Sequence, residues 1–441
     1  ELAAELGIEA HEMNDVYDSF ALLTGHTIAR QQPLPEARME PTREVEQRMR
    51  AQITEWEGII VEQLQAFSRQ PREYADALMP SAQNVATAWE ESQNYLAQGL
   101  ISMAYHKARV AAVAGDGLEQ SVRLLQGLVE QNINGLRNEL RAMHSVVANH
   151  EEFLAAVGRL PLNTVGDALA VMGAYSSALT AKSSIIKASI DEHRANALLE
   201  AIMDGSLEGE AAWNELGLTM TSAAIWYQSA RFVLLDGIRA WELGMNRSST
   251  APIDTAALRE LAHTTTVSAK AVLDNYEALV VPPAANSNHV AQSALTDHLI
   301  TNDSDYRSAK FSINVALNAR DASDMHELLY ALVAAERGFL DASMLLMRDY
   351  SLGASRDESG TVTGVRHEMA FRQALRSAEN NARSGAAALL TRSGEVPDAL
   401  SAVYQRAAVL REGSLDDRFI SLRGFWSIAL QANTAEHLVA R

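Results

Sequence analysis

The fold of this chain is decided by the stretch "GLEQSVRLLQGLVEQNINGLRNELRAMHSVV", residues 117–147. Its large apolar residues recur every three or four positions, the spacing that gathers them on one side of an α-helix. The series consists of Leu118, Val122, Leu125, Val129, Ile133, Leu136, Leu140, Met143 and Val147. Alternating β-branched runs around tight glycine turns, which are typical of strands, are missing from the sequence. The pattern therefore predicts an all-α protein.

The same spacing covers most of the chain and predicts a series of long helices. Their expected ranges are 2–30, 42–69, 81–114, 117–156, 164–205, 207–246, 254–280, 287–320, 322–350, 363–392, 396–412 and 415–440. Short connections between such helices make sequence neighbours antiparallel. We therefore expect elongated antiparallel bundles of long helices.

Four segments rich in proline, glycine or serine interrupt the helical spacing. They are "QQPLPEARMEPT" (31–42), "GMNRSSTAPID" (244–254), "VVPPAANSN" (280–288) and "SLGASRDESGTVTG" (351–364). A chain of 441 residues is long enough for two or more cores. We place a domain boundary at 246–254, which separates an N-terminal helical bundle (1–246) from a C-terminal helical bundle (254–441).

Two short stretches predict where one helix ends and the next begins. In "AGDGLEQ" (114–120), Gly115 is expected to end a helix, and Asp116 to cap the next one. In "EGSLDDRF" (412–419), Gly413 and Ser414 have the same roles. The acidic stretch "NDSDYR" (302–307) lacks the glycine and glutamate of a calcium loop, so we interpret it as a helix break with a polar cap.

Composition excludes several classes of function. The formal net charge is −19, which repels phosphate backbones and anionic lipid surfaces, so we expect no nucleic-acid partner. The chain contains no cysteine, which excludes disulfides, thiolate zinc sites and a cysteine nucleophile. No apolar run approaches the roughly 20 residues that a membrane span needs. The chain begins with Glu1 and has no signal peptide, so we expect a processed piece, such as the periplasmic or extracytoplasmic ectodomain of a membrane protein.

One pair of residues has the spacing of a metal site. Glu260 and His263 form the only Glu-x-x-His of the chain. A di-metal carboxylate bundle needs two such pairs and two further core glutamates. On a helical wheel, Glu260 and His263 also fall opposite the apolar side of their helix. We predict a solvated helix face and no metal site.

Other signatures of enzymes are missing as well. The sequence has no Gly-x-Ser-x-Gly, no His-Glu-x-x-His and no glycine-rich phosphate loop. We therefore expect no cofactor and a protein that is not an enzyme.

The stretch "HELLYALVAAERGFLDASMLLMRDY" (326–350) holds a charged residue on an apolar face. Glu336 falls in the middle of the apolar stripe, while Arg337, Asp341 and Arg348 line its edge. A carboxylate there must be paired, hydrogen-bonded or neutral. One interpretation is a structural ion pair that fixes the helix register. The other is a ligand pocket between helices, in which Glu336 positions an arginine that holds an anion.

A second unusual segment, "AKSSIIKASIDEHRANALLEAIMDGSL" (181–207), has apolar residues all around the helical wheel. Such a helix is usually contacted on several sides. Arg194 lies within it, and an arginine in a crowded helix usually has a carboxylate partner.

These two segments carry a family resemblance. The stretch "AAERGF" (334–339) resembles the Glu-Arg-Gly stretch of bacterial nitrate- and nitrite-sensing (NIT-type) helical domains, and "DEHRANALLEAIMDGSLEGEAAWNEL" (191–216) looks like a later helix of that family. The resemblance implies the all-helical sensory part of a bacterial receptor, with Arg337 and Arg194 as anion holders. The two pieces occur here in reverse order, so they would belong to different copies of the motif.

Three hypotheses of function remain open. The first is a ligand-sensing module of a bacterial signalling protein, which binds a small anion or polar molecule between helices, with Arg194, Arg337 and Glu336 at its site, and forms a homodimer. The second is a helical scaffold or protein-binding module without a small ligand. An enzyme is the third, although no paired catalytic residues favour it. Trp213, Trp226 and Trp241 favour the scaffold if they form one exposed patch.

Overall fold

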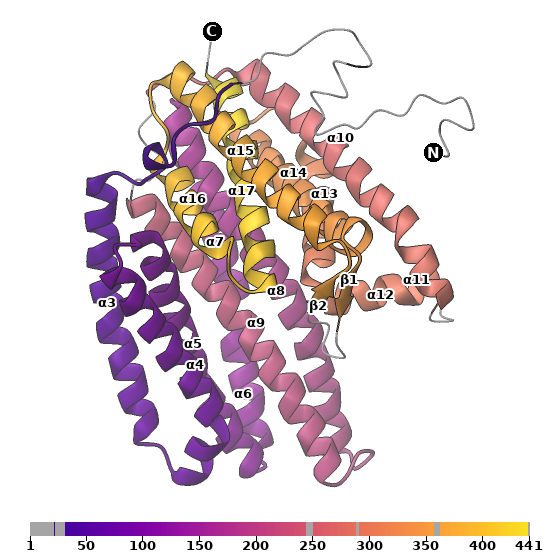
Figure 1. Ribbon diagram of the computed structural model, residues 1–441. Helices are drawn as coiled ribbons and strands as arrows, with labels where there is room; N and C mark the ends of the chain where they lie inside the picture. Colours follow the sequence, from indigo (N-terminus) through magenta and orange to yellow (C-terminus); the bar gives the residue numbers. More distant parts are fainter. Residues whose placement is uncertain (1–21, 23–30, 244–249, 288–290, 357–361, 440–441) are drawn as a thin grey trace.

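The computed structural model describes residues 22, 31–243, 250–287, 291–356 and 362–439. Nearly all of these residues lie in α-helices that pack against one another, and the described β structure is one small hairpin. The expectation of an all-α fold is confirmed (Figure 1). None of the described helices is both long and apolar enough to cross a membrane.

The first layer is a three-helix bundle on the left of Figure 1, which follows a single 3₁₀ turn, η1 (Glu36–Arg38). Its members are α3 (Arg43–Ser68), α4 (Arg72–Ala97) and α5 (Ile101–Val129). Trp56 of α3 and Tyr105 of α5 meet in its core with their ring centroids 4.8 Å apart.

The second layer contains the two longest helices. They are the antiparallel pair α8 (Val165–Met203) and α9 (Glu210–Leu243), which α6 (Ile133–His144) and α7 (Val146–Val157) cover. Helix α8 contacts α6, α7, α9, α13, α14 and α17. The prediction that this helix is contacted on several sides is therefore confirmed.

The third layer follows residue 250, on the right of Figure 1. It contains α10 (Thr255–Leu279), α11 (Val281–Ser287), α12 (Gln292–Asn302), α13 (Ser304–Ala319) and α14 (Met325–Leu345). A π-helical turn, η2 (Leu346–Ser351), extends α14 into the hairpin of β1 (Ala354–Arg356) and β2 (Val362–Val365). The last group is α15 (Glu368–Ser393), α16 (Asp398–Leu410) and α17 (Leu415–Leu438), which packs on α5, α10 and α14.

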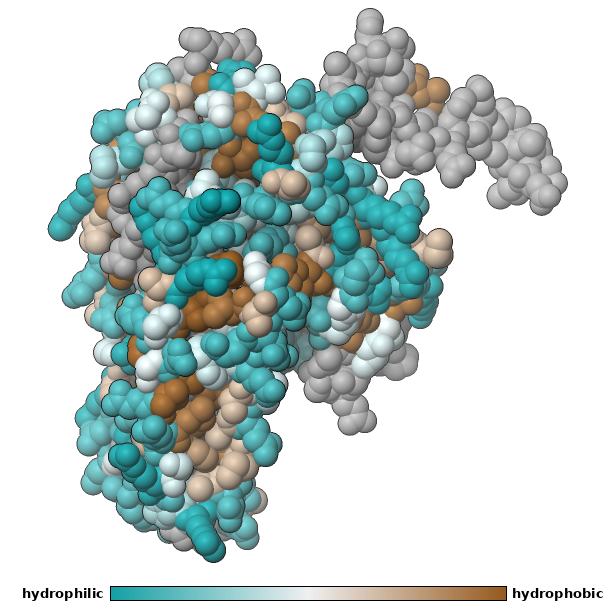
Figure 2. All heavy atoms as spheres, turned by 60° about the vertical axis from the view of Figure 1, so that its left-hand side comes forward, coloured by the Kyte–Doolittle hydropathy of each residue, from teal (hydrophilic) through white to brown (hydrophobic). Residues whose placement is uncertain are grey.

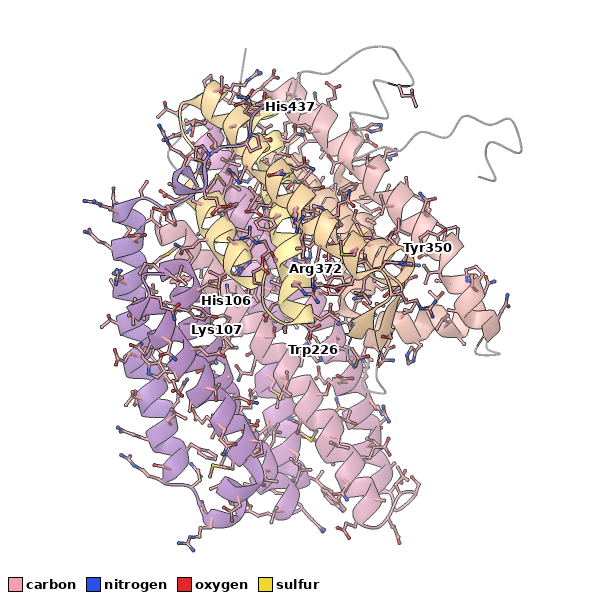
Figure 3. All side chains as sticks on the ribbon, in the orientation of Figure 1. His106, Lys107, Trp226, Tyr350, Arg372 and His437 are labelled. Carbon is pink, nitrogen blue, oxygen red and sulfur yellow. The ribbon has the colours of Figure 1, made fainter. Side chains whose placement is uncertain are left out.

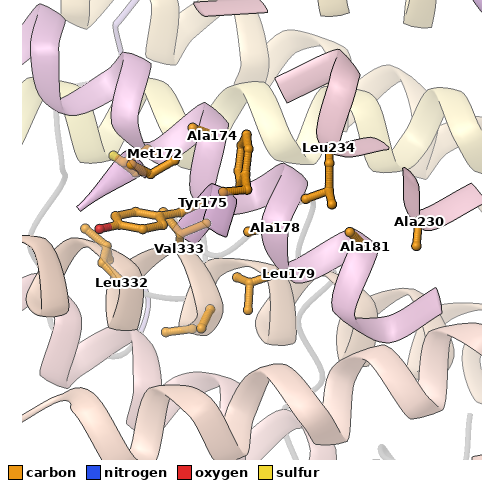
Figure 4. Packing of buried hydrophobic residues seen from close by; sticks show 14 of the residues in the cluster. Met172, Ala174, Tyr175, Ala178, Leu179, Ala181, Ala230, Leu234, Leu332 and Val333 are labelled. Atoms are coloured by element: carbon orange, nitrogen blue, oxygen red, sulfur yellow. The ribbon is translucent and has the colours of Figure 1, made fainter. Parts of the chain in front are cut away.

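The largest buried cluster draws on both sides of the predicted domain boundary. In Figure 4, Met172, Tyr175 and Leu179 of α8 pack beside Leu332 and Val333 of α14. The connecting segment is also fixed to both halves: the amide of Val165 donates to Ala251, and the amide of Asp254 donates to Leu438. Residues 244–249 lie outside the described part of the chain, and the division into bundles 1–246 and 254–441 stays a prediction.

Several predicted helix ends are wrong, each for a local reason. Gly115 does not end a helix but lies inside α5, where a Cβ would be 1.9 Å from Oε1 of Gln63 on α3, so this glycine permits close helix packing. The apolar series of 117–147 continues across two breaks. At the first, Gln131 has a φ of 50° and the side chain of Asn132 caps α6. At the second break, near Ser145, α6 ends and α7 begins.

Other predicted ends agree with the structure. Ser414 and Asp417 form a capping box at the start of α17. Asp303 ends α12 and caps α13 by accepting bonds from the amides of Asp305 and Tyr306, so the polar cap expected in 302–307 is confirmed. The segment 280–288 is not a plain break, since α11 begins there at Val281. The expected helix at 2–30 lies outside the described residues, except Leu22.

Candidate functional site

The candidate site is a cavity of ≈ 250 Å³ enclosed by α8, α14 and α17, with the start of α16 at its edge. Its charged lining residues are one carboxylate, Glu336, and two guanidinium groups, Arg337 and Arg423. The remaining lining residues are Leu169, Met172, Gly173, Ser176, Val333, Leu340, Pro397, Leu400, Ser427 and Gln431. The volume has room for about eight groups of the size of a water molecule, at ~30 Å³ each.

Helical spacing explains why these side chains face one space. Residues three, four, seven and eight positions apart share a helix face. On α14 the lining positions are Val333, Glu336, Arg337 and Leu340, and on α17 they are Arg423, Ser427 and Gln431. Helix α8 contributes Leu169, Met172, Gly173 and Ser176. The cavity therefore lies where one stripe from each helix converges.

Glu336 has one hydrogen-bond partner and no cation partner among the described residues. Its Oε1 accepts a bond of 2.5 Å from the hydroxyl of Thr434, and the residue is only 5% exposed. Burial raises the pKa of the Glu336 carboxyl to about 7, and the bond from Thr434 opposes that rise. The expectation that this carboxylate must be hydrogen-bonded or neutral is confirmed. It is not the structural ion pair considered above.

Arg337 is held by three neighbouring groups. Its Nε donates to Ser308 at 2.8 Å, one terminal nitrogen donates to Thr180 of α8, and Asp341 lies 3.6 Å away. Burial lowers the pKa of the Arg337 guanidinium, and the Asp341 carboxylate opposes this. Glu336 does not position Arg337, since they share no hydrogen bond or ion pair among the described contacts.

Arg423 shares the fully buried Asp341 with Arg337. One of its terminal nitrogens donates to Asp341, and the other lies 3.4 Å from Asp305. The Asp341 carboxylate raises the pKa of Arg423 against the effect of burial. The two guanidinium groups on the cavity wall thus share Asp341, behind the wall, as the main carboxylate that neutralises their charge.

The ionic contacts continue from the cavity to the π-helical turn. Asp305 also accepts from Arg348 in η2 at 2.9 Å, and Arg348 contacts Asp303 and Asp349 at 2.9 and 2.8 Å. Burial lowers the pKa of Arg348, but the three aspartates outweigh it and raise that pKa above its usual value. A continuous series of charged contacts links Arg337 to η2, the kind of irregular turn that often occurs at functional sites.

More positive charge lies on the other side of Arg423. Arg406 of α16 has no ion pair or hydrogen bond with a described side chain, and burial, followed by the charge of Arg109, lowers its pKa to about 10. Burial and the same Arg109 hold the pKa of His106 well below its usual value. Figure 3 labels His106 and Lys107 on α5, which contacts α16. Asp236 neutralises Arg109 at 2.5 Å.

The predicted site residues are not all together. Glu336 and Arg337 both line the cavity, but Arg194 does not. The Arg194 side chain is 64% exposed and forms an ion pair of 2.6 Å with Glu215, as expected for an arginine with a carboxylate partner. Glu260 and His263 are exposed, and no group of metal-binding side chains occurs among the described residues. Trp213 and Trp226 are half-buried, and the side chain of Trp241 lies outside the described part.

Sequence reasoning missed Arg423 and Thr434. Both lie on α17, whose apolar and polar residues alternate too irregularly to define one face. The one available signal was the stripe of Arg423, Ser427, Gln431 and Thr434, which repeats every three to four positions. Without the packing of α17 on α14, nothing in the sequence links this stripe to Glu336.

A second hollow has the opposite chemistry. It has a volume of ≈ 580 Å³, lies between α7, α8 and α9, and is lined mainly by apolar side chains, among them Phe153, Leu234, Leu235 and Ile238. Leu235 and Ile238 are 43% and 44% exposed. Such a surface fits an apolar partner better than a charged one.

Comparisons with protein-family models, curated proteins and solved structures find no match to this chain.

Proposed function

We propose that this chain is a ligand-sensing helical module that binds a small anion or polar molecule in the α8–α14–α17 cavity. The observation that carries the proposal is the pair of guanidinium groups, Arg337 and Arg423, on one cavity wall with the buried Asp341 as their main shared counter-ion. Two arginines have about ten N–H donors, and the described bonds use a minority of them. An anion with two oxygens fits the planar donor fork of such a group.

The balance of charge at the cavity supports an anionic ligand. When Glu336 is neutral, Arg337 and Arg423 contribute two positive charges and Asp341 one negative charge. Arg406 adds a further positive charge near Arg423. The field at the cavity therefore favours a negatively charged group, although the chain as a whole carries a formal charge of −19.

A route from ligand to conformational change follows from the same contacts. An anion that binds Arg423 competes with Asp305 and Asp341 for its donors. Asp305 also holds Arg348, so a change at Arg423 alters the contacts of η2 and the hairpin beyond it. A ligand biases such an equilibrium only by binding one arrangement more tightly than the other. We propose that the two arrangements differ in which aspartates Arg348 and Arg423 share.

The proposal also covers the kind of protein to which this module belongs, its location and its oligomeric state. The NIT-type resemblance of "AAERGF" (334–339) implies the sensory part of a bacterial receptor, and we further propose that this module is extracytoplasmic and forms a homodimer. Its support here is that Glu336 and Arg337 of this stretch both line the cavity. Arg194, the other residue implied by the resemblance, is not part of the proposed site.

The test is thermal unfolding at constant ionic strength with nitrate, nitrite, small carboxylates and amino acids. A ligand at 100 times its dissociation constant adds about 2.7 kcal/mol to the stability of the unit that binds it. We expect stabilisation by one class of these compounds, lost in Arg337→Ala and Arg423→Ala. Arg194→Ala is the matched control, because Arg194 lies on the surface, and it should respond as the wild type does. The absence of any ligand effect, or an equal effect in all variants, would contradict the proposal.

A protein-binding scaffold is the second candidate, and the apolar hollow of ≈ 580 Å³ favours it. Figure 2 shows hydrophobic patches on a largely hydrophilic surface. This candidate predicts that no small molecule stabilises the chain. It also predicts that an amphipathic helical peptide binds the wild type and not Leu235→Asp, as fluorescence anisotropy would measure.

A further inference from the structure

We propose that the ligand of the cavity is an apolar α-amino acid, whose carboxylate binds Arg337 and Arg423 while its ammonium group binds Glu336. This inference depends on the proposed function and specifies its ligand. It starts from an imbalance: a carboxylate and two guanidinium groups line one cavity, yet no ion pair joins Glu336 to either arginine.

Glu336 has capacity for a further donor. A carboxylate has two oxygens that together accept about four hydrogen bonds. Thr434 provides one bond, to Oε1, and no lysine, arginine or histidine of the described chain forms an ion pair with Glu336. A buried carboxylate in this situation is destabilised in its charged form. An ammonium group that enters the cavity supplies the missing cation.

Arg337 and Arg423, by contrast, require a negatively charged group of the ligand. Arg337 and Arg423 reach away from Glu336 to Asp341, which lies behind the wall, and to Ser308, Thr180 and Asp305. A simple anion would satisfy the arginines and leave Glu336 without a cation. A simple amine would supply a cation for Glu336 but would leave the two arginines without an anion. A zwitterion with both groups on one carbon complements all three side chains.

The rest of the wall defines the ligand side chain. The other lining residues carry no charge: Ser176, Ser427 and Gln431 are polar, whereas Leu169, Met172, Pro397 and Leu400 are apolar. With Val333 and Leu340 of α14 they surround the part of the ligand that is not charged. The cavity of ≈ 250 Å³ is larger than a nitrate ion needs, since it has room for about eight water-sized groups. An aliphatic amino acid such as leucine, valine or methionine fits these limits.

Binding of an ammonium group requires Glu336 to be ionised. The charged groups that line the cavity with it are Arg337 on α14 and Arg423 on α17, and the lining residues of α8 and α16 add none. Burial raises the pKa of Glu336 to about 7. Binding of the amino acid therefore releases a proton at neutral pH, and its affinity increases as the pH rises through 7.

The experiment is isothermal titration calorimetry of the full chain with L-leucine, L-valine and L-methionine. Each is compared with its analogue without the ammonium group, such as 4-methylpentanoate for leucine, and with its analogue without the carboxylate, such as 3-methylbutylamine. We expect at least one amino acid to bind, and both of its analogues to bind roughly 10- to 100-fold more weakly, because each leaves buried charged groups unpaired. In two buffers of different ionisation enthalpy, the amino acid should also release protons.

Two variants make the assignment specific. Glu336→Gln keeps an acceptor for Thr434 but removes the charge, so the preference for leucine over 4-methylpentanoate should fall to within about threefold. Arg194→Ala, the matched surface control, should keep the wild-type preference. Circular dichroism confirms that each variant is folded.

The outcomes separate this inference from the proposed function. Equal affinity for leucine and 4-methylpentanoate, or stabilisation by nitrate or a small carboxylate in the thermal screen without binding of any amino acid, would overturn the inference and leave the proposed function standing. An unchanged preference in Glu336→Gln would overturn the role of Glu336. Binding of none of these compounds would overturn the inference, and the absence of any ligand effect in the thermal screen would overturn the proposed function as well.

Discussion

Thr434 of α17 donates a hydrogen bond of 2.5 Å to Glu336 of α14, across 98 residues of sequence. Thr434 is 2% exposed and Glu336 is 5% exposed, so water cannot readily replace this bond. Asp341, five residues further along α14, is bonded to Arg423 of α17 in the same interface. The two contacts join the helices at Glu336 and at Arg423, two of the three charged residues that line the cavity, which makes the α14–α17 interface a determinant of its shape.

The first prediction concerns pH. The pKa of Glu336 is raised from 4.5 to about 7 in the folded chain, so its neutral form is favoured there. The raised pKa means that protonated Glu336 stabilises the folded chain relative to ionised Glu336. This stabilisation is fully present below pH 4.5 and is lost as the pH rises through 7. The shift is equivalent to about 3 kcal/mol. Urea unfolding between pH 4.5 and 8.5 should show this decrease for the wild type relative to Glu336→Gln. Parallel curves for the two proteins would contradict it.

The second prediction concerns the bond itself. Thr434→Val keeps the size of the side chain and removes the donor to Glu336. We expect a loss of about 1–3 kcal/mol in the free energy of unfolding at pH 8, where Glu336 is ionised, and a smaller loss at pH 5. Thr296→Val is the control, because Thr296 is half-buried on α12 and its hydroxyl donates to the Gln292 carbonyl of its own helix, not to a carboxylate. If both variants lose the same amount, the bond has no special importance.

A third prediction concerns Arg348. This side chain is 10% exposed and contacts Asp303, Asp305 and Asp349. Arg348→Ala removes the cation that three half-buried carboxylates share, and we expect it to lower the free energy of unfolding by about 3–5 kcal/mol. Arg372, labelled in Figure 3, is the matched control, since it is 60% exposed and pairs with Glu368 on its own helix. Arg372→Ala should cost less than about 1 kcal/mol in the same denaturant titration.

A fourth prediction tests the glycine of "AAERGF". A Cβ on Gly338 would lie 2.5 Å from Cγ1 of Ile313, whereas a Cβ on Gly117 of α5 would meet nothing within 4 Å. Gly338→Ala should therefore destabilise the chain by about 1–3 kcal/mol. Gly117→Ala should stabilise it by about 0.5–1 kcal/mol, because alanine favours a helix interior.

A double variant tests whether Gly338→Ala destabilises the chain through contact with Ile313. Ile313→Ala removes the atom that the new Cβ would contact, so the double variant should be more stable than the sum of the two single losses implies. Simple additivity of the two losses would show that α13 and α14 do not meet at this pair.

The sequence predicts the helices better than their ends, and the reason is physical. Apolar spacing reports which side of a segment is buried, and it runs through 117–147 even though the chain breaks at Gln131 and near Ser145. A glycine is ambiguous by itself. Gly413 lies just outside a helix as predicted, whereas Gly115 lies inside α5 because Gln63 of α3 packs against it. That contact depends on a partner helix that no local pattern specifies.

The residues of the candidate site likewise include some that the sequence predicts and some that it does not. The burial of Glu336 follows from its position in the apolar stripe of residues 326–350, and the structure agrees. Arg423 and Thr434 could not be predicted, because their importance comes from the way α17 crosses α14. Arg194 was proposed from a resemblance, and it lies on the surface with Glu215 instead of at the cavity.

The most direct test of a ligand site between α8, α14 and α17 is a crystal structure of the chain. It should be determined in the presence of whichever compound stabilises the chain most in the thermal screen. We predict electron density for that compound inside the cavity, with an anionic group within hydrogen-bond distance of Arg337 or Arg423. Density for the compound at another site, with only water in the cavity at a saturating concentration, would contradict the account.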